Sequence, residues 1–299
     1  GAQNIYEFEV EVATAAYVDK KNVRFGIRQI ELIKEADDYG ESFYFMVNGL
    51  SVFIKGANYV PQDNFLSRVD SSRYEKLIAS VIDANINMLR VWGGGFYENE
   101  IFYDLCDKNG ILVWQDFMFA CAMYPGDKAF LNNVRDEAID NVTRLSNHPC
   151  IALWCGNNEI AEGWGNWGWR DDYAPEIAAE VEAAYEHLFE KVLPDVVEAH
   201  DPSRPYWSSS PSLGWGHAES LTGGDSHFWG VWWGMEPFRT YAEKVPRFAS
   251  EFGFQALPDP ATIEAFAEVP PTRMDEPDMA AHQKHPTGYE TIATYLARD

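Results

Sequence analysis

The stretch Ile151-Ala152-Leu153-Trp154-Cys155-Gly156-Asn157-Asn158-Glu159 joins a short apolar run to a polar turn that ends in an acid. An apolar run of this length, bounded by a turn, is typical of a strand buried on both faces. The stretch Arg247-Phe248-Ala249-Ser250-Glu251-Phe252-Gly253-Phe254 has the same form and carries a second acid. Because ionised carboxylates are costly beside apolar residues, Glu159 and Glu251 require a functional explanation.

The same order of elements recurs on both sides of these stretches. Apolar strands are predicted near residues 51–57, 86–91, 111–117, 150–155, 204–209, 223–229 and 247–252, and helices near 72–84, 98–109, 128–147, 174–199 and 238–244. Strands that alternate with helices favour parallel pairing through right-handed crossovers. The predicted fold class is therefore α/β, and seven strands are one short of a closed (β/α)8 TIM barrel. The tail after Pro258 contains a helical pattern near 285–296 but no convincing eighth strand. We therefore expect an incomplete barrel within a longer polypeptide.

The first residues follow a different pattern. Residues 6–12 alternate between apolar and acidic side chains, which is typical of a strand with one solvated face. A second strand is predicted over residues 23–32, and Asn48-Gly49 supplies the positive φ angles of a tight hairpin between residues 43–47 and 50–54. We therefore expect residues 1–45 to be the end of a β-sandwich domain and residues 46–299 to be the barrel domain.

Composition excludes several classes of function. The chain has 299 residues and a net charge of −24, which disfavours binding to nucleic acids or anionic lipids. It contains neither a signal peptide nor an apolar run long enough to span a membrane, which predicts a soluble protein. The four cysteines are predicted to be buried free thiols, and none has the spacing of a zinc motif. His282 and His285 favour a solvated loop or helix start over a metal site.

Polar and aromatic residues gather at the predicted strand ends, where the reactive groups of a barrel lie. The strands end in Arg90-Val91-Trp92-Gly93, Trp114-Gln115-Asp116, Asn157-Asn158-Glu159, His227-Phe228-Trp229 and Ser250-Glu251. Two carboxyls facing each other across an indole-lined pocket form the arrangement that glycoside hydrolysis requires. The alternatives are a helix-start carboxylate for Glu159 and an ion pair with Arg247 or Arg90 for Glu251. Trp114 favours packing over substrate contact.

Several longer motifs together indicate a family. The chain resembles the catalytic barrel of glycoside hydrolase family 2, and within it the β-mannosidases, along nearly its whole length. The resemblance is carried by Gly56-Ala57-Asn58-Tyr59-Val60-Pro61-Gln62-Asp63, Trp92-Gly93-Gly94-Gly95, Trp114-Gln115-Asp116-Phe117, Trp154-Cys155-Gly156-Asn157-Asn158-Glu159 and Ser250-Glu251-Phe252-Gly253-Phe254-Gln255. Family 2 enzymes place sugar-binding and immunoglobulin-like domains before the barrel, so the resemblance implies that residues 1–45 end an immunoglobulin-like β-sandwich.

The resemblance also implies a role for each matching residue. Glu159 would be the general acid/base and Glu251 the nucleophile of a retaining exo-β-mannosidase that removes terminal non-reducing β-D-mannose. Asn158 would hold the sugar 2-hydroxyl, while the aromatic walls of the subsite would be Trp92, Trp167 and Trp229. Weaker candidates for substrate contact are His227 and Asp116. The resemblance implies a carbohydrate substrate, other domains of a longer parent chain, no cofactor and no metal.

This mechanism sets two structural expectations. The carboxyls of Glu159 and Glu251 should lie ~5–5.5 Å apart, as in retaining enzymes. Glu159 should have a raised pKa, because it must hold a proton in the first step. Two alternatives stay open: another exo-acting family 2 specificity, such as β-galactosidase or exo-β-glucosaminidase, and a non-catalytic carbohydrate-binding fragment.

Overall fold

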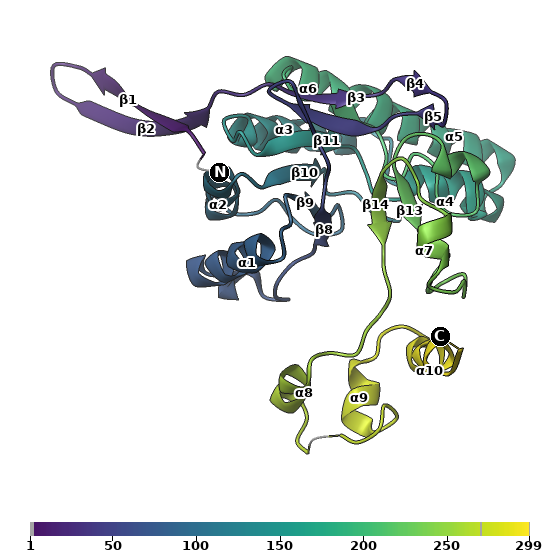
Figure 1. The fold of residues 1–299 in the computed structure, drawn as a ribbon. Helices are drawn as coiled ribbons and strands as arrows, with labels where there is room; N and C mark the ends of the chain where they lie inside the picture. The colour runs from purple at the N-terminus through teal and green to yellow at the C-terminus, as the bar shows by residue number, and fades with distance from the viewer. Residues whose placement is uncertain (1–2, 270, 299) are drawn as a thin grey trace.

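The computed structural model describes residues 3–269 and 271–298, and its central feature is a parallel sheet (Figure 1). The sheet has the order β12-β11-β10-β9-β8, so neighbouring strands follow one another along the chain. Its strands are β8 (Gly56–Tyr59), β9 (Met88–Val91), β10 (Leu112–Asp116), β11 (Ile151–Cys155) and β12 (Tyr206–Trp207). A second parallel ladder joins β13 (Ser226–Phe228) to β14 (Ala249–Phe252). The predicted α/β class is therefore confirmed.

Helices connect the parallel strands, as the sequence pattern predicts. They are α1 (Ser71–Asp83), α2 (Glu100–Asn109), α3 (Lys128–Leu145), α4 (Ile160–Asn166), α5 (Pro175–His187), α6 (Leu193–His200) and α7 (Thr240–Glu243). A π-helical turn (Leu188–Val192) joins α5 to α6, so the predicted helix over 174–199 is nearly continuous. Side-chain capping stabilises the N-termini of α1 and α3. Asp70 accepts a hydrogen bond from Arg73 N, and Asp127 accepts one from Ala129 N.

The N-terminal segment is built from antiparallel strands. The hairpin of β1 (Ile5–Ala13) and β2 (Val18–Gly26) projects from the body of the molecule (Figure 1). It is followed by a sheet of β3 (Ile30–Ile33), β6 (Tyr44–Val47) and β7 (Leu50–Val52), and by the short pair β4 (Ala36–Asp37) and β5 (Gly40–Glu41). The predicted strand over residues 23–32 is thus divided between β2 and β3. The Asn48-Gly49 hairpin is confirmed, with φ angles of 51° and 76°.

The strand predicted over residues 51–57 is wrong. Its first residues belong to β7, which pairs antiparallel with β6, and the first parallel strand is β8. The expected domain boundary between residues 45 and 46 falls within β6. Phe43 and Phe45 from this segment pack on Phe248, and Phe43 also stacks on Trp114. The antiparallel sheet and the parallel strands therefore share part of one core.

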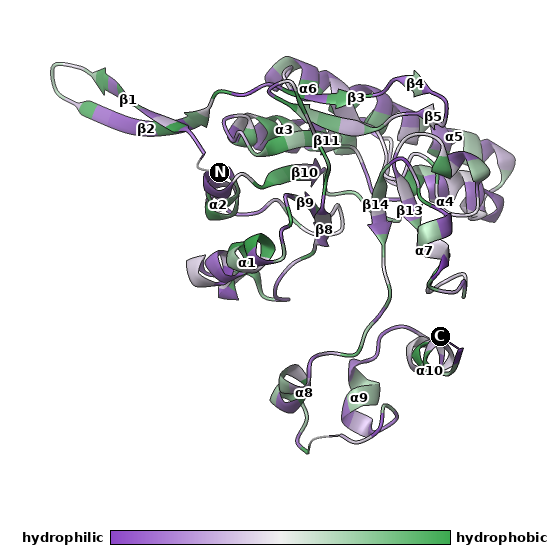
Figure 2. Ribbon diagram, in the orientation of Figure 1, coloured by the Kyte–Doolittle hydropathy of each residue, from purple (hydrophilic) through white to green (hydrophobic). Residues whose placement is uncertain are grey.

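The main core lies between the parallel sheet and the surrounding helices. It contains fully buried residues of β10 and β11 together with the inner faces of α1, α2, α3 and α6. In Figure 2, the first part of β10 is hydrophobic and its tip is hydrophilic, whereas β2 of the projecting hairpin is largely hydrophilic throughout. The buried strands are held rigidly, which fixes the residues at their ends.

The chain continues after β14 into α8 (Pro260–Phe266), α9 (Pro277–His282) and α10 (Gly288–Arg298). Tyr295 of α10 packs with Phe228 and Val231, which anchors this segment beside the end of β13. Within residues 3–269 and 271–298, no further parallel strand pairs with β8 or β14. No helix among those residues has the length and apolar character needed to cross a membrane.

Candidate active site

Glu159 lies in the turn between β11 and α4. Its backbone is left-handed, with φ 61°, a conformation that residues with a side chain adopt rarely and at an energetic cost. Hydrogen bonds from Asn158 N to Phe119 O (2.9 Å) and from Glu159 N to Ser210 O (2.7 Å) hold this turn. The carboxylate makes no capping hydrogen bond to α4. The alternative that Glu159 serves only the helix start is therefore wrong.

Glu251 lies in β14, opposite His227 of β13. Arg90 Nη1 donates to Glu251 Oε1 at 2.6 Å, whereas Arg247 pairs with Asp37. The ion-pair alternative is thus right for Arg90 and wrong for Arg247. Glu251 nevertheless lines the same cavity as Glu159, so its ion pair does not remove it from that cavity.

The two carboxylates meet beside one imidazole. His227 Nδ1 lies 2.8 Å from Glu159 Oε1 and 3.5 Å from Glu251 Oε2, and the three groups have atoms within 4.8 Å of one another. This closeness agrees with the ~5–5.5 Å carboxyl separation of retaining glycosidases. Three such groups could also hold a metal ion. However, the adjacent guanidinium of Arg90 already neutralises part of their charge and would repel a second cation.

Arg90 organises the floor of the cavity, although the sequence analysis assigned it no role beyond a possible ion pair. All five of its N–H groups are used: Nε and Nη2 donate to Asp116, Nη1 to Asn58 and Glu251, and Nη2 also to Asn158. Five donors matched to acceptors on β8, β10, β14 and the turn after β11 fix these elements relative to one another. The available signal was an arginine inside the apolar strand Met88–Val91.

Asp116, a candidate for substrate contact in the sequence analysis, lies below the cavity and not in its lining. It is fully buried and accepts hydrogen bonds from Arg90, from Gly93 N and from Trp114 Nε1. Burial raises the pKa of this carboxyl, against the opposing influence of Arg90. Because its oxygens are enclosed by protein donors, Asp116 positions Arg90, and it is not among the residues that line the cavity.

The pKa of Glu159 also differs from the expected rise. Burial acts to raise its pKa, but the hydrogen bond and the electrostatic interaction with His227 outweigh burial, with smaller contributions from Cys121 and Arg90. The net pKa of Glu159 therefore lies below its ordinary value, and the predicted rise is wrong for the ligand-free site. The expectation considered the negative neighbour Glu251 but not the hydrogen bond from His227.

The cavity has a volume of about 1000 Å³ and opens between β8 and β14. Trp92 and Trp229 line it together with Asn158 and the two glutamates. His227 is buried behind the glutamates and reaches the cavity through them. Trp167 lies outside this lining, half exposed at the end of α4, where it packs edge-on against Trp169. A contact between Trp167 and substrate stays a prediction.

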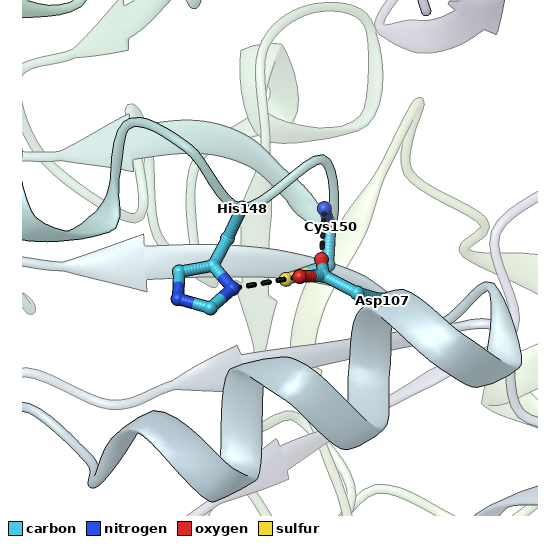
Figure 3. Close-up of side chains that lie close together, drawn as sticks. All are labelled: Asp107, His148 and Cys150. Carbon is cyan, nitrogen blue, oxygen red and sulfur yellow. Dashed lines mark hydrogen bonds and ion pairs between the residues drawn. The ribbon is translucent and has the colours of Figure 1, made fainter. Parts of the chain in front are cut away.

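A second group of side chains that could bind a metal lies at the opposite end of the strands (Figure 3). His148 Nδ1 lies 2.7 Å from Asp107 Oδ2, and Cys150 N donates to Asp107 Oδ1 at 2.8 Å. The other ring nitrogen of His148 faces Glu100 at 3.0 Å. Since both nitrogens of His148 have carboxylate partners, the group is best explained as a link between α2 and the start of β11.

Comparison with known proteins places these residues in a family context. No family model matches the chain. β-Mannosidase B of Aspergillus clavatus is 38% identical over 308 residues, which cover 100% of this chain and 36% of that protein. The crystal structure of a β-D-mannosidase from Dictyoglomus thermophilum has a TM-score of 0.82 and 45% identity, covering 93% of this chain and 33% of the other. A β-glucuronidase of Parabacteroides merdae, at 19% identity and a TM-score of 0.57, shares the fold alone.

The chain therefore spans about a third of the length of the two β-mannosidases, and its likeness covers 100% of the chain for the first and 93% for the second. The resemblance to the β-mannosidases that the motifs indicate is confirmed.

Proposed function

We propose that the longer protein containing this chain is a retaining exo-β-mannosidase, which removes terminal β-D-mannose from carbohydrate substrates. The observation that carries the proposal is the closeness of Glu159 and Glu251 within one cavity, with atoms of both carboxylates within 4.8 Å. The relatives named β-mannosidase support the choice of sugar.

The reaction would proceed by double displacement. Glu251 Oε attacks the anomeric carbon and forms a glycosyl ester, while the bond to the leaving oxygen breaks and protonated Glu159 gives that oxygen its proton. The carboxylate of Glu159 then takes a proton from water, the resulting hydroxide displaces Glu251 from the anomeric carbon, and both glutamates regain their starting states. Arg90 would hold Glu251 in line through its 2.6 Å hydrogen bond.

The site would recognise the sugar through its amide and aromatic groups. Asn158 is oriented by Arg90 Nη2, which donates to its Oδ1 at 2.7 Å and leaves the NH2 group directed toward Glu159. The N–H that faces Glu159 at 3.3 Å would turn to the 2-hydroxyl of a bound sugar, while the other N–H stays on Cys121 Sγ. The flat faces of Trp92 and Trp229 suit the C–H surface of the ring.

We also propose that the parallel strands form part of a (β/α)8 barrel whose eighth strand lies in a further segment of the parent protein. The cavity extends between β8 and β14, and apolar side chains of Phe53, Val245 and Phe252 are exposed along it. The β1–β2 hairpin likewise exposes Tyr6 and Phe8 on one face, which suits a β-sandwich completed by a preceding domain.

The function is tested with the full-length parent protein and the nitrophenyl β-glycosides of mannose, galactose, glucose and glucosamine. The mannoside should have the highest kcat/KM. Glu251→Gln should lower kcat by at least ~10³-fold, and Glu159→Ala should regain turnover of an activated mannoside with added azide, forming the β-mannosyl azide. Preference for another sugar, or unchanged turnover in Glu251→Gln, would refute the proposal.

A further inference from the structure

Cys121 is the accessible thiol beside the acid/base. The other three cysteines of the chain, Cys106, Cys150 and Cys155, are buried, so the prediction of buried thiols is confirmed for them and wrong for Cys121. Cys121 follows β10 with a left-handed backbone (φ 48°), and its N–H donates to Asn158 O at 3.0 Å. A residue with a side chain is held in this conformation only where its surroundings compensate for the strain. The turn directs the thiol into the cavity that holds both glutamates.

Hydrogen-bond partners determine which way each group around this thiol points. Arg90 can only donate, so the amide oxygen of Asn158 must face it, and the NH2 group of Asn158 faces Cys121 Sγ at 3.4 Å. The sulfur therefore accepts from Asn158, and its single S–H is left for Glu159 Oε2 at 3.5 Å, an oxygen that also accepts from Asn158 Nδ2 at 3.3 Å. The other oxygen of Glu159, Oε1, is held by His227.

We propose that Cys121 is a positioning residue for the acid/base: its S–H holds Oε2 of Glu159 and favours the carboxylate form. This inference rests on the proposed role of Glu159 in hydrolysis. A thiol is a weak donor, so it steadies Oε2 without binding it as tightly as a hydroxyl would. Glu159 can then both give and receive the proton as the reaction requires.

The charged groups around Glu159 and Cys121 agree with this hydrogen bond. The groups that face Glu159 are His227 from β13, Arg90 from β9, Glu251 from β14 and Cys121 from the loop after β10. Burial and the charge of Glu159 raise the pKa of Cys121 to about 11. The thiol therefore stays protonated at neutral pH and is available as a donor.

The first test measures kcat/KM of the full-length parent protein for nitrophenyl β-mannoside as a function of pH. Cys121→Ser supplies a stronger donor and should move the alkaline limb about 0.5 pH units lower, whereas Cys121→Ala removes the donor and should move it about 0.5 units higher. Above the limb, these shifts change kcat/KM about threefold in opposite directions. Ala122→Ser, at the exposed neighbouring position, is the matched control and should leave the limb unchanged.

The second test does not depend on turnover. If the thiol donates to Glu159, replacing the acid must lower the pKa of the thiol, because the coupling between two sites is reciprocal. Cys121 should therefore be alkylated by iodoacetamide at least about threefold faster in Glu159→Gln than in the unmodified protein at pH 8, as followed by peptide mass spectrometry. The three buried cysteines serve as internal controls.

The two tests separate the possible failures. Absent mannosidase turnover with faster alkylation in Glu159→Gln would refute the proposed function and support the coupling. Normal turnover with an alkaline limb that stays fixed, or shifts in the same direction, in Cys121→Ser and Cys121→Ala would overturn the role of Cys121 alone. Equal alkylation rates in both proteins would also overturn it.

Discussion

Replacing Arg90 by lysine tests whether hydrogen-bond geometry, and not charge alone, organises the site. The guanidinium reaches four residues through five hydrogen bonds of 2.6 to 3.3 Å. A lysine ammonium keeps the charge but offers three donors from one point. At least two of the five bonds must therefore be lost, and buried acceptors on Asp116, Asn158 or Glu251 are left without partners.

The expected losses of stability and of activity follow from the kind of hydrogen bond that is removed. Hydrogen bonds to charged groups contribute ~1.5–3 kcal/mol each, so losing two should lower the free energy of unfolding by ~3–6 kcal/mol. Displacing Glu251 or Asn158 by about 1 Å should lower kcat/KM by ~10²-fold. Unfolding in urea, followed by tryptophan fluorescence, measures the first quantity, and hydrolysis of nitrophenyl β-mannoside measures the second.

Arg144→Lys provides the matched control. Arg144 also bonds two side chains, Glu100 and Asn141, but it is partly exposed on α3. Exposed pairs of this kind contribute ~0.2–1 kcal/mol, so this variant should stay close to the unmodified protein. The reasoning would be refuted if Arg90→Lys retained kcat/KM within threefold, or if the two lysine variants lost equal stability.

Three further predictions concern other parts of the chain. The pKa of His148 is raised because hydrogen bonds to Asp107 and Glu100 outweigh burial. The protonated imidazole therefore stabilises the fold fully below pH ~6.5, and this contribution is lost as pH rises through the folded pKa. His148→Gln should accordingly lower Tm more at pH 5.5 than at pH 9. Gly93→Ala would place a Cβ 2.5 Å from Phe119 O; thermal unfolding should show a lower Tm, unlike Gly165→Ala, where the Cβ meets no atom within 4 Å. Trp229→Ala should lower kcat/KM by at least ~10-fold in the mannoside assay, because it removes a wall of the cavity.

The alternation of strands and helices could be predicted because each element carries its own periodic pattern. The β9, β10, β11 and β14 strands lie within a few residues of the predicted ranges. The first parallel strand was misplaced because residues 50–59 contain two short strands that follow each other closely and pair with different partners. Residues 50–52 pair with β6 and residues 56–59 with β9, and local pattern does not reveal which partner a strand takes.

The meeting of Glu159 and Glu251 was predictable because parallel strands bring their carboxyl ends to one edge. The groups between them were harder to identify, since their roles depend on contacts far apart in the sequence. Arg90 bonds to Glu251 across 161 positions, and Cys121 reaches Glu159 across 38. Asp116 was expected to face substrate because it ends a strand, yet Arg90 and Trp114 enclose it.

His227 explains why the pKa of Glu159 lies low, and its replacement gives a directional test. Burial alone would raise the pKa of Glu159, and the imidazole reverses this through a 2.8 Å hydrogen bond to Oε1. His227→Gln removes the electrostatic contribution of the imidazole while keeping a polar group of similar reach, so burial should dominate and the pKa of Glu159 should rise. Because the general acid works in its protonated form, the alkaline limb of kcat/KM should then move to higher pH. An unchanged limb, or one displaced to lower pH, would mean that His227 does not control the proton on Glu159.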